Sequence, residues 1–198
     1  MQRTGSSLTA LRARILERSP TVFVVAVCLG MLFNTTASAV NTLLSLPLFF
    51  DTVFTMVVAA LCGPVAGVVT GLGSNILFDV CIGGPGTSWP FGVINAANGL
   101  IVGMSVQKRM FRYGSHVVIV AMIAAVSSAL FGAVVAHFFF GGTTGFPVDS
   151  ITHGLLLTGK PVFWAAFLAR IPVNAVDKAI AVLAAFLAYR IVFVHGSN

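Results

Sequence analysis

Residues 63–79 read GPVAGVVTGLGSNILFD, and this stretch decides the fold. Small or polar residues occupy every fourth position in it, namely Gly63, Gly67, Gly71, Asn75 and Asp79. Residues four apart lie on one face of a helix, so the stretch predicts a helix with a glycine groove at one end and polar groups at the other. The groove suits another helix, and a buried polar end suits a solute.

The composition of the chain indicates that this helix lies in a membrane. The 198 residues are 58% hydrophobic and 8% charged, with a mean hydropathy of +1.01, whereas about a quarter of residues are charged in soluble globular proteins. Because about 20 apolar residues span the hydrocarbon core, a chain of this length accommodates about six spans and no soluble domain. The three cysteines lie in apolar sequence without ligand spacing, so no metal site is expected.

The predicted fold class is an all-α integral membrane protein with a bundle of six transmembrane helices. Apolar runs place these helices at residues 20–40, 47–62, 64–82, 91–106 and 117–140, with the sixth inside 161–194. The second and third helices form a tight hairpin at Gly63-Pro64, because proline cannot continue a helix. The sixth run is too long for one straight span, so we expect Pro172 to kink it or its first turns to follow the membrane interface.

Basic residues beside the spans predict the orientation. They gather before the first helix, between the fourth and fifth, and at the end of the last: Arg3, Arg12, Arg14, Arg18, Lys108, Arg109, Arg112 and Arg190. With six spans these residues share one side, so the positive-inside rule places residues 1–19 and 195–198 in the cytoplasm on either side of the membrane domain, 20–194. The net charge of +6 therefore reflects topology and anionic lipid rather than nucleic acid.

With this orientation, the polar residues within the spans gather in the outer half of the bundle. Buried polar groups in a membrane are costly and normally face the bundle interior, which predicts a polar chamber open to the outside. The candidate solute-binding residues are Asn34, Asp51, Asn75, Asp79, Trp89, Asn95, Asn98, Arg170, Asn174 and Asp177.

Each candidate also has a structural interpretation. An ion pair with Asp51 or Asp79 accounts for Arg170 almost as well as a ligand does, and Asp177 with Lys178 suits a structural pair. The asparagines are also suited to hydrogen bonds between helices, and tryptophans at helix ends commonly anchor a protein at the membrane interface.

Two small residues in the first helix suggest a partner. Ala26 and Gly30 are four apart and allow close helix approach, so they are candidates for docking another protein. The chain contains no GxxxxGK[ST] phosphate loop, and a subunit that captures a solute and takes energy from partner proteins fits this absence.

Two segments carry a family resemblance. LPLFFDTVFTMVVAALCGPVAGVVTGLGSNILFD at 46–79 and RIPVNAVDKAIAVLAAFLAYR at 170–190 resemble helices 2, 3 and 6 of the substrate-specific S components of energy-coupling factor (ECF) transporters. The resemblance implies a subunit of an ABC-type importer that captures a vitamin, nucleobase or similar micronutrient at the outer face of the prokaryotic cytoplasmic membrane. It also implies a transmembrane coupling protein and two cytoplasmic ATPases as partners, which use the ATP, while this chain binds no cofactor.

Two other functions remain open from the residues. One is a small membrane enzyme acting on a lipid or isoprenoid, with Asp51, Asp79 and Asp177 as acid, base or metal groups. The other is a structural subunit of a larger membrane complex. An enzyme of the first kind is expected to show a paired-carboxylate motif such as DDxxD, which the chain lacks.

Overall fold

The computed structural model describes residues 19–82 and 88–193, and this part of the chain is helical with no strand. The predicted segments 1–19 and 195–198 lie outside it, apart from Ser19. The elements, in chain order, are α2 (Pro20–Leu43), α3 (Val53–Cys62), α4 (Pro64–Ile82), the short 3₁₀ helix η1 (Trp89–Phe91), α5 (Gly92–Gln107), the 3₁₀ helix η2 (Met110–Arg112), α6 (Gly114–Phe140), α7 (Asp149–Leu157) and α8 (Val162–Phe193).

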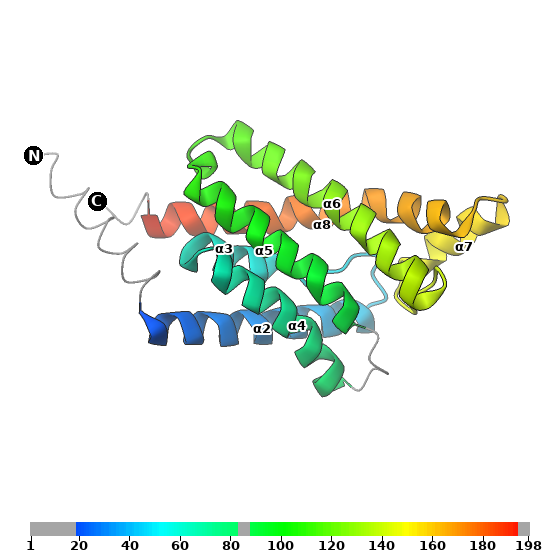
Figure 1. Cartoon of the computed structure of the whole chain (residues 1–198), viewed down its shortest axis with the longest axis horizontal. Helices are drawn as coiled ribbons and strands as arrows, with labels where there is room; N and C mark the ends of the chain where they lie inside the picture. Colours follow the sequence, from blue (N-terminus) through cyan, green and yellow to red (C-terminus); the bar gives the residue numbers. More distant parts are fainter. Residues whose placement is uncertain (1–18, 83–87, 194–198) are drawn as a thin grey trace, which may run out of the picture.

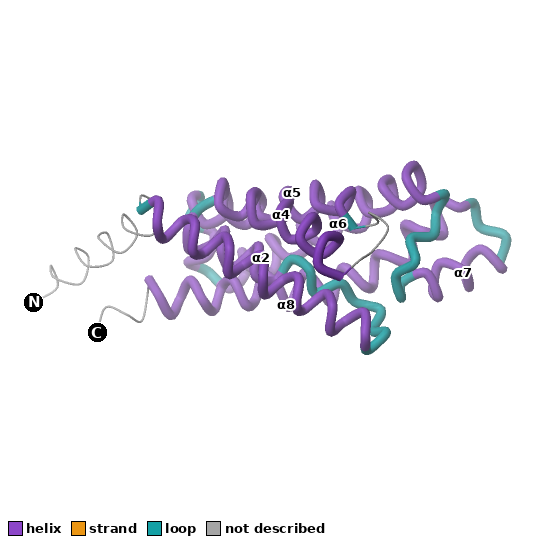
Figure 2. The backbone as a smooth tube through the Cα atoms, turned by 90° about the horizontal axis from the view of Figure 1, so that it is seen from below, coloured by secondary structure: helices purple, strands orange, loops and turns teal. Residues whose placement is uncertain are grey.

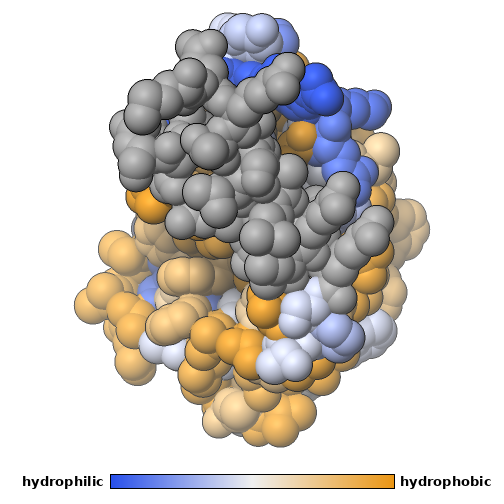
Figure 3. Space-filling view, turned by 90° about the vertical axis from the view of Figure 1, so that its left-hand side faces the viewer, coloured by the Kyte–Doolittle hydropathy of each residue, from blue (hydrophilic) through white to orange (hydrophobic). Residues whose placement is uncertain are grey.

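Helices α2, α3, α4, α5, α6 and α8 alternate in direction, with α2 and α8 along the long axis of the molecule and α4 and α5 oblique to it (Figure 1). Helix α2 begins, and α8 ends, at the same end as the connection between α5 and α6. Figure 3 views this end and shows hydrophilic residues gathered along its upper edge above apolar sides. The exposed residues Lys108, Arg109 and Arg112 lie in that connection.

Length and composition make α2, α4, α6 and the segment Trp89–Gln107 candidates for membrane spans within the described residues. Helix α3 is apolar but has 10 residues, and α8 has 32 residues with four charged side chains, those of Arg170, Asp177, Lys178 and Arg190. The prediction of an all-α membrane protein is therefore confirmed, and the count of six spans stays a prediction.

The second helix was predicted to begin near residue 47, and this was wrong, because α3 begins at Val53. The segment 44–52 is not helical and turns back into the bundle, as Figure 2 shows. Pro47 and positive φ values at Ser45 and Phe50 (52° and 51°) interrupt the helical path. We call residues 44–52 the re-entrant segment.

The hairpin between α3 and α4 is confirmed. Gly63 caps α3 with φ 92°, a conformation that side chains with a Cβ rarely adopt, and α4 begins at Pro64. A single residue thus separates two helices that run in opposite directions.

Helix α7 was not predicted, since the stretch after α6 reads as a loop. Its first residue, Asp149, accepts hydrogen bonds from the backbone N–H groups of Thr144 (2.5 Å) and Gly145 (2.7 Å), which orders the turn before the helix. Helix α8 continues through Pro172 as one element, so the helix itself accounts for the long final apolar run.

The glycine groove of α4 packs against α5, as the spacing predicted. A Cβ added to Gly71 would lie 2.5 Å from the carbonyl carbon of Asn95, and one added to Gly99 would lie 2.5 Å from that of Gly67. The two backbones therefore touch without side chains between them. This contact fixes the spacing between Asn75 on α4 and Asn95 on α5.

We expect Gly99→Ala to lower the free energy of unfolding by about 1–3 kcal/mol, because the added methyl group overpacks a backbone contact. Thermal unfolding of the detergent-purified protein measures the effect. Gly154→Ala in α7 is the matched control, since nothing lies within 4 Å of its added Cβ and alanine favours helix. A Gly99→Ala protein that unfolds at the wild-type temperature would contradict the close packing of α4 and α5.

Candidate functional site

A pocket lies among α2, the re-entrant segment, α4, α5, α6 and α8. About 660 Å³ of space lies between its walls, a volume that includes the solvent at its open side. Its walls are Ser38, Asn41, Thr42, Leu48, Phe49, Asp51, Asn75, Phe78, Ser88, Phe91, Ile94, Asn95, Ser128, Gly132, Phe146, Arg170, Asn174 and Lys178.

A buried charge cluster joins α8 to the re-entrant segment. The Nζ of Lys178 lies 2.5 Å from Oδ2 of Asp177 and 3.8 Å from Oδ1 of Asp51, and it donates a hydrogen bond to Oγ1 of Thr52 at 2.6 Å. Asp177 also accepts from the backbone N–H of Phe50 at 2.8 Å. One buried cation thus faces two carboxylates, and both carboxylates make further hydrogen bonds.

An amide pair crosses from α5 to α4 next to this cluster. The Nδ2 of Asn95 donates to Oδ2 of Asp51 (2.8 Å) and to Oδ1 of Asn75 (2.6 Å). Asn75 in turn donates to the carbonyl oxygen and the hydroxyl oxygen of Ser88 (2.9 and 3.1 Å). These hydrogen bonds orient both amides along one wall of the pocket.

Arg170 supplies a second buried cation, about 12 Å along α8 from Lys178 by helix geometry. Its side chain is 1% exposed. Nη1 donates to the carbonyl oxygen of Ala166 at 3.1 Å, and Nε has no hydrogen-bond partner. No carboxylate within residues 19–82 and 88–193 forms a salt bridge with it.

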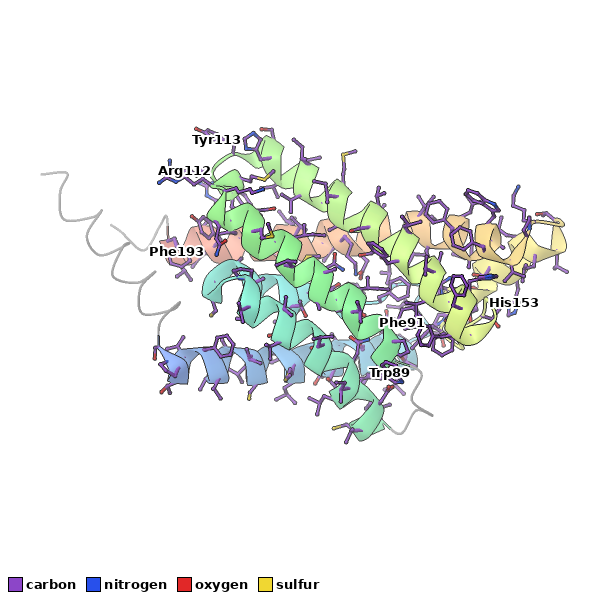
Figure 4. The ribbon with its side chains drawn as sticks, in the orientation of Figure 1. Trp89, Phe91, Arg112, Tyr113, His153 and Phe193 are labelled. Atoms are coloured by element: carbon purple, nitrogen blue, oxygen red, sulfur yellow. The ribbon has the colours of Figure 1, made fainter. Side chains whose placement is uncertain are left out.

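Aromatic rings complete the pocket. The ring of Phe91 stacks on Phe140, with centroids 5.7 Å apart, and meets Phe146 edge to face at 6.1 Å. Phe49 of the re-entrant segment lies beneath Lys178, whose Nζ is 5.9 Å from the ring centroid. Figure 4 shows Phe91 at the end of the bundle opposite to Arg112 and Tyr113. The pocket therefore offers flat apolar surfaces beside amide groups.

Five of the ten predicted solute-binding residues line this pocket: Asp51, Asn75, Asn95, Arg170 and Asn174. The other five lie outside its walls. Asp177 forms an ion pair with Lys178. Asp79 accepts hydrogen bonds from the backbone N–H groups of Ser88 and Trp89. Trp89 is 52% exposed and meets Phe139 edge to face.

The remaining two asparagines bond to neighbouring helices. Asn34, fully buried, donates from Nδ2 to Thr55 Oγ1 (2.8 Å) and to Ser74 Oγ (3.1 Å), and accepts from the backbone N–H of Phe54 (2.9 Å). Asn98 exchanges hydrogen bonds with Ser128. These contacts match the structural interpretation, while solute contact at these positions remains an untested prediction.

The pocket also includes residues that sequence reasoning missed, above all Asn41 and Phe91. Asn41 follows Asn34 by seven residues and Phe91 precedes Asn95 by four, so each shares a helix face with a predicted residue. Extending the spacing by two turns from Asn34 finds Asn41, and extending it by one turn from Asn95 finds Phe91. Nothing in the sequence marks Gly132 or Phe146.

The two predicted docking residues differ in exposure. Gly30 is buried, and a Cβ there would lie 2.8 Å from Thr70 Cγ2 and 2.9 Å from Val58 Cγ2. Gly30 therefore packs inside the bundle against α4 and α3. Ala26 is partly buried beside the cluster of Val27, Val58, Cys62 and Ala66, and its docking role stays a prediction.

A helical membrane bundle with a pocket of aromatic, amide and charged groups at one end is the class of protein expected to bind a small molecule within the membrane. A sequence model of the family described as "ECF-type riboflavin transporter, S component" matches residues 21–192. The chain belongs to this family. A search of curated proteins and a search of solved structures each returned no match.

Membership settles the class of function. The chain is a substrate-binding membrane subunit of an ECF transporter, and its solute is vitamin-like. Such a subunit is not an enzyme, so the family does not support the alternative of an enzyme acting on a lipid or isoprenoid. The family also implies an ECF module, with ATPases and a coupling protein, as the partner.

Removing the buried lysine tests the charge cluster. We expect Lys178→Met to lower the free energy of unfolding by about 3–5 kcal/mol, because it leaves the buried carboxylate of Asp177 and the half-buried carboxylate of Asp51 without their cation. Unfolding in detergent mixtures measures this. The double variant Lys178→Met/Asp177→Asn is expected to recover part of the loss, since it removes one of the two charges. A stable single variant would show that the three groups do not interact as the distances indicate.

Proposed function

We propose that this chain captures a flavin, riboflavin or a close derivative, in the pocket described above. The observation that carries the proposal is that aromatic rings and oriented amides line the same pocket. The chain also belongs to a family described as riboflavin transporter S components. Riboflavin has a flat fused-ring system, carbonyl and N–H groups along one edge of it, and a chain of hydroxyl groups.

The walls fit each part of such a molecule. Phe91 and Phe146 suit the flat ring system. Asn95 suits an N–H group on its edge, because the Nδ2 group donates to Asp51 and Asn75 and leaves the amide oxygen Oδ1 as an acceptor. Asp51 and Lys178 suit hydroxyl groups, which also donate and accept.

We further propose that the chain crosses the prokaryotic cytoplasmic membrane six times with both termini in the cytoplasm. Support comes from the alternating direction of α2, α3, α4, α5, α6 and α8 and from the basic connection between α5 and α6 (Figure 1). In this arrangement the re-entrant segment and α3 together make the second crossing. The pocket then lies in the half of the bundle that faces outward.

The proposed partners are a transmembrane coupling protein and two cytoplasmic ATPases, which hydrolyse the ATP, while this chain binds no cofactor of its own. Ala26 on α2 remains the candidate docking residue. It lies in the first half of α2, near the end of the bundle that carries the basic connection, so a partner bound there would contact the cytoplasmic half of the protein.

Titration of riboflavin into the purified protein tests the proposed solute. Saturable quenching of flavin fluorescence is expected, and Phe91→Ala should weaken binding by about 5- to 150-fold, the equivalent of about 1–3 kcal/mol for one lost ring stack. Phe193→Ala, at the opposite end of the bundle (Figure 4), is the matched control and should bind like wild type. Failure of folded wild-type protein to bind either riboflavin or its 5′-phosphate would refute the proposal.

Cysteine labelling in intact cells tests the orientation. In a background without Cys28, Cys62 and Cys81, Leu157→Cys should react with a membrane-impermeant reagent added outside, because Leu157 is 90% exposed in α7. Arg112→Cys, in the basic connection, should react only after the cells are opened. External labelling at position 112 would reverse the proposed topology.

A further inference from the structure

Arg170 differs from the other cation of the pocket in its ionic partners. Lys178 faces Asp177 and Asp51 at 2.5 and 3.8 Å. Arg170, as deeply buried, has no carboxylate within the 4.0 Å of a salt bridge anywhere in residues 19–82 and 88–193. The two cations lie on one helix and line one pocket. The protein neutralises Lys178 with its own carboxylates and leaves Arg170 without an ionic partner, which a bound solute could supply.

The carboxylate that compensates the charge of Arg170 in part is already hydrogen-bonded elsewhere. It belongs to Asp149 and acts on Arg170 from beyond salt-bridge distance. Its Oδ2 accepts the backbone N–H groups of Thr144 and Gly145, at 2.5 and 2.7 Å, and so its carboxylate is held in the turn before α7. It therefore stabilises the charge of Arg170 only in part and satisfies none of its N–H groups.

The surroundings of Arg170 leave room for its side chain and leave polar atoms unsatisfied. A Cβ added to Gly132 on α6 would lie 3.3 Å from Cδ and 3.6 Å from Nε of Arg170, so the glycine makes space for this side chain. Nε has no hydrogen-bond partner, and neither does the buried Oδ1 of Asn41 across the same pocket. Two residues that line the pocket thus carry buried polar atoms without partners, one a donor and one an acceptor.

A buried guanidinium without an ionic partner is unfavourable, and a bound anion removes the penalty. Riboflavin is uncharged at neutral pH and supplies no such partner. A phosphate group carries a charge of about −1.5 to −2 at pH 7, and its oxygens match the planar donors of arginine.

We propose that the pocket selects a flavin carrying a negatively charged group, and that Arg170, seated against Gly132, binds that group. The inference rests on the proposed flavin function and sharpens it: phosphorylated riboflavin is the preferred solute, with the phosphate against Arg170. Riboflavin and its phosphate ester would contact the aromatic and amide walls in the same way. The charged group alone therefore determines which of the two binds more tightly.

The test compares riboflavin with its 5′-phosphate in the purified wild-type protein by titration calorimetry. The phosphate ester should bind at least about tenfold more tightly, the size expected for charge-assisted hydrogen bonds. Equal affinities, or tighter binding of riboflavin, would overturn the inference while leaving the flavin function in place. Failure of both flavins to bind would refute the flavin function, and the inference with it.

Variants then assign the preference to Arg170. Arg170→Gln should lose the tenfold preference, because the phosphate ester loses more affinity than riboflavin does when the guanidinium is removed. Arg190→Gln, which removes one positive charge near the other end of α8, is the matched control and should keep the preference. Gly132→Ala retains the charge but crowds Cδ of Arg170, so it should reduce the preference even where Arg170→Gln does not fold. A preference that survives both Arg170→Gln and Gly132→Ala would exclude Arg170 as its source.

Discussion

The hydrogen bond from the backbone N–H of Phe50 to Asp177 on α8 fixes the segment on which the pocket depends. Irregular backbone is tolerated at membrane depth only where protein groups satisfy it. Asp177, Asn41 and Asn34 perform this role: Asn41 donates to the carbonyl oxygens of Leu46 and Leu48, and Asn34 accepts from Phe54 as α3 begins. Without these contacts, the segment that carries Phe49 and Asp51 would have no defined path through the bundle.

A second constraint comes from the backbone contact between α4 and α5. Glycines at 67, 71 and 99 bring the two helices together, and at this separation the amides of Asn75 and Asn95 meet at 2.6 Å. The amide wall is therefore a product of helix packing. The charge cluster on α8 reaches the same wall through Asp51, which accepts from Asn95. Packing, charge and hydrogen bonding thus converge on one small group of side chains.

The sequence predicted the helices well where apolar runs ended at Pro, Gly or polar residues, and poorly where they did not. Residues 46–50 are as apolar as a helix, so nothing marked the re-entrant segment, whose positive φ values fall on Ser45 and Phe50 rather than on glycine. Five of the ten predicted site residues line the pocket. The sequence could not distinguish these five from the others, because Asn34 and Asn75 look alike in sequence and only their neighbours in space decide which of them lines a cavity. Likewise, the sequence could not show that Arg170 lacks an ionic partner, because this depends on where Asp51 and Asp79 lie in space.

The touching backbones of α4 and α5 also limit how such a protein diversifies. No side chain lies between Gly67 and Gly99 or between Gly71 and Asn95, so no substitution there widens or narrows the space between the helices without displacing a whole helix. The spacing of this wall is therefore set by backbone, whereas α2, the re-entrant segment, α6 and α8 contribute side chains such as Asn41, Phe49 and Arg170, which can be exchanged without moving α4 away from α5. The pocket can thus be reshaped through its side chains while the frame that carries them stays fixed.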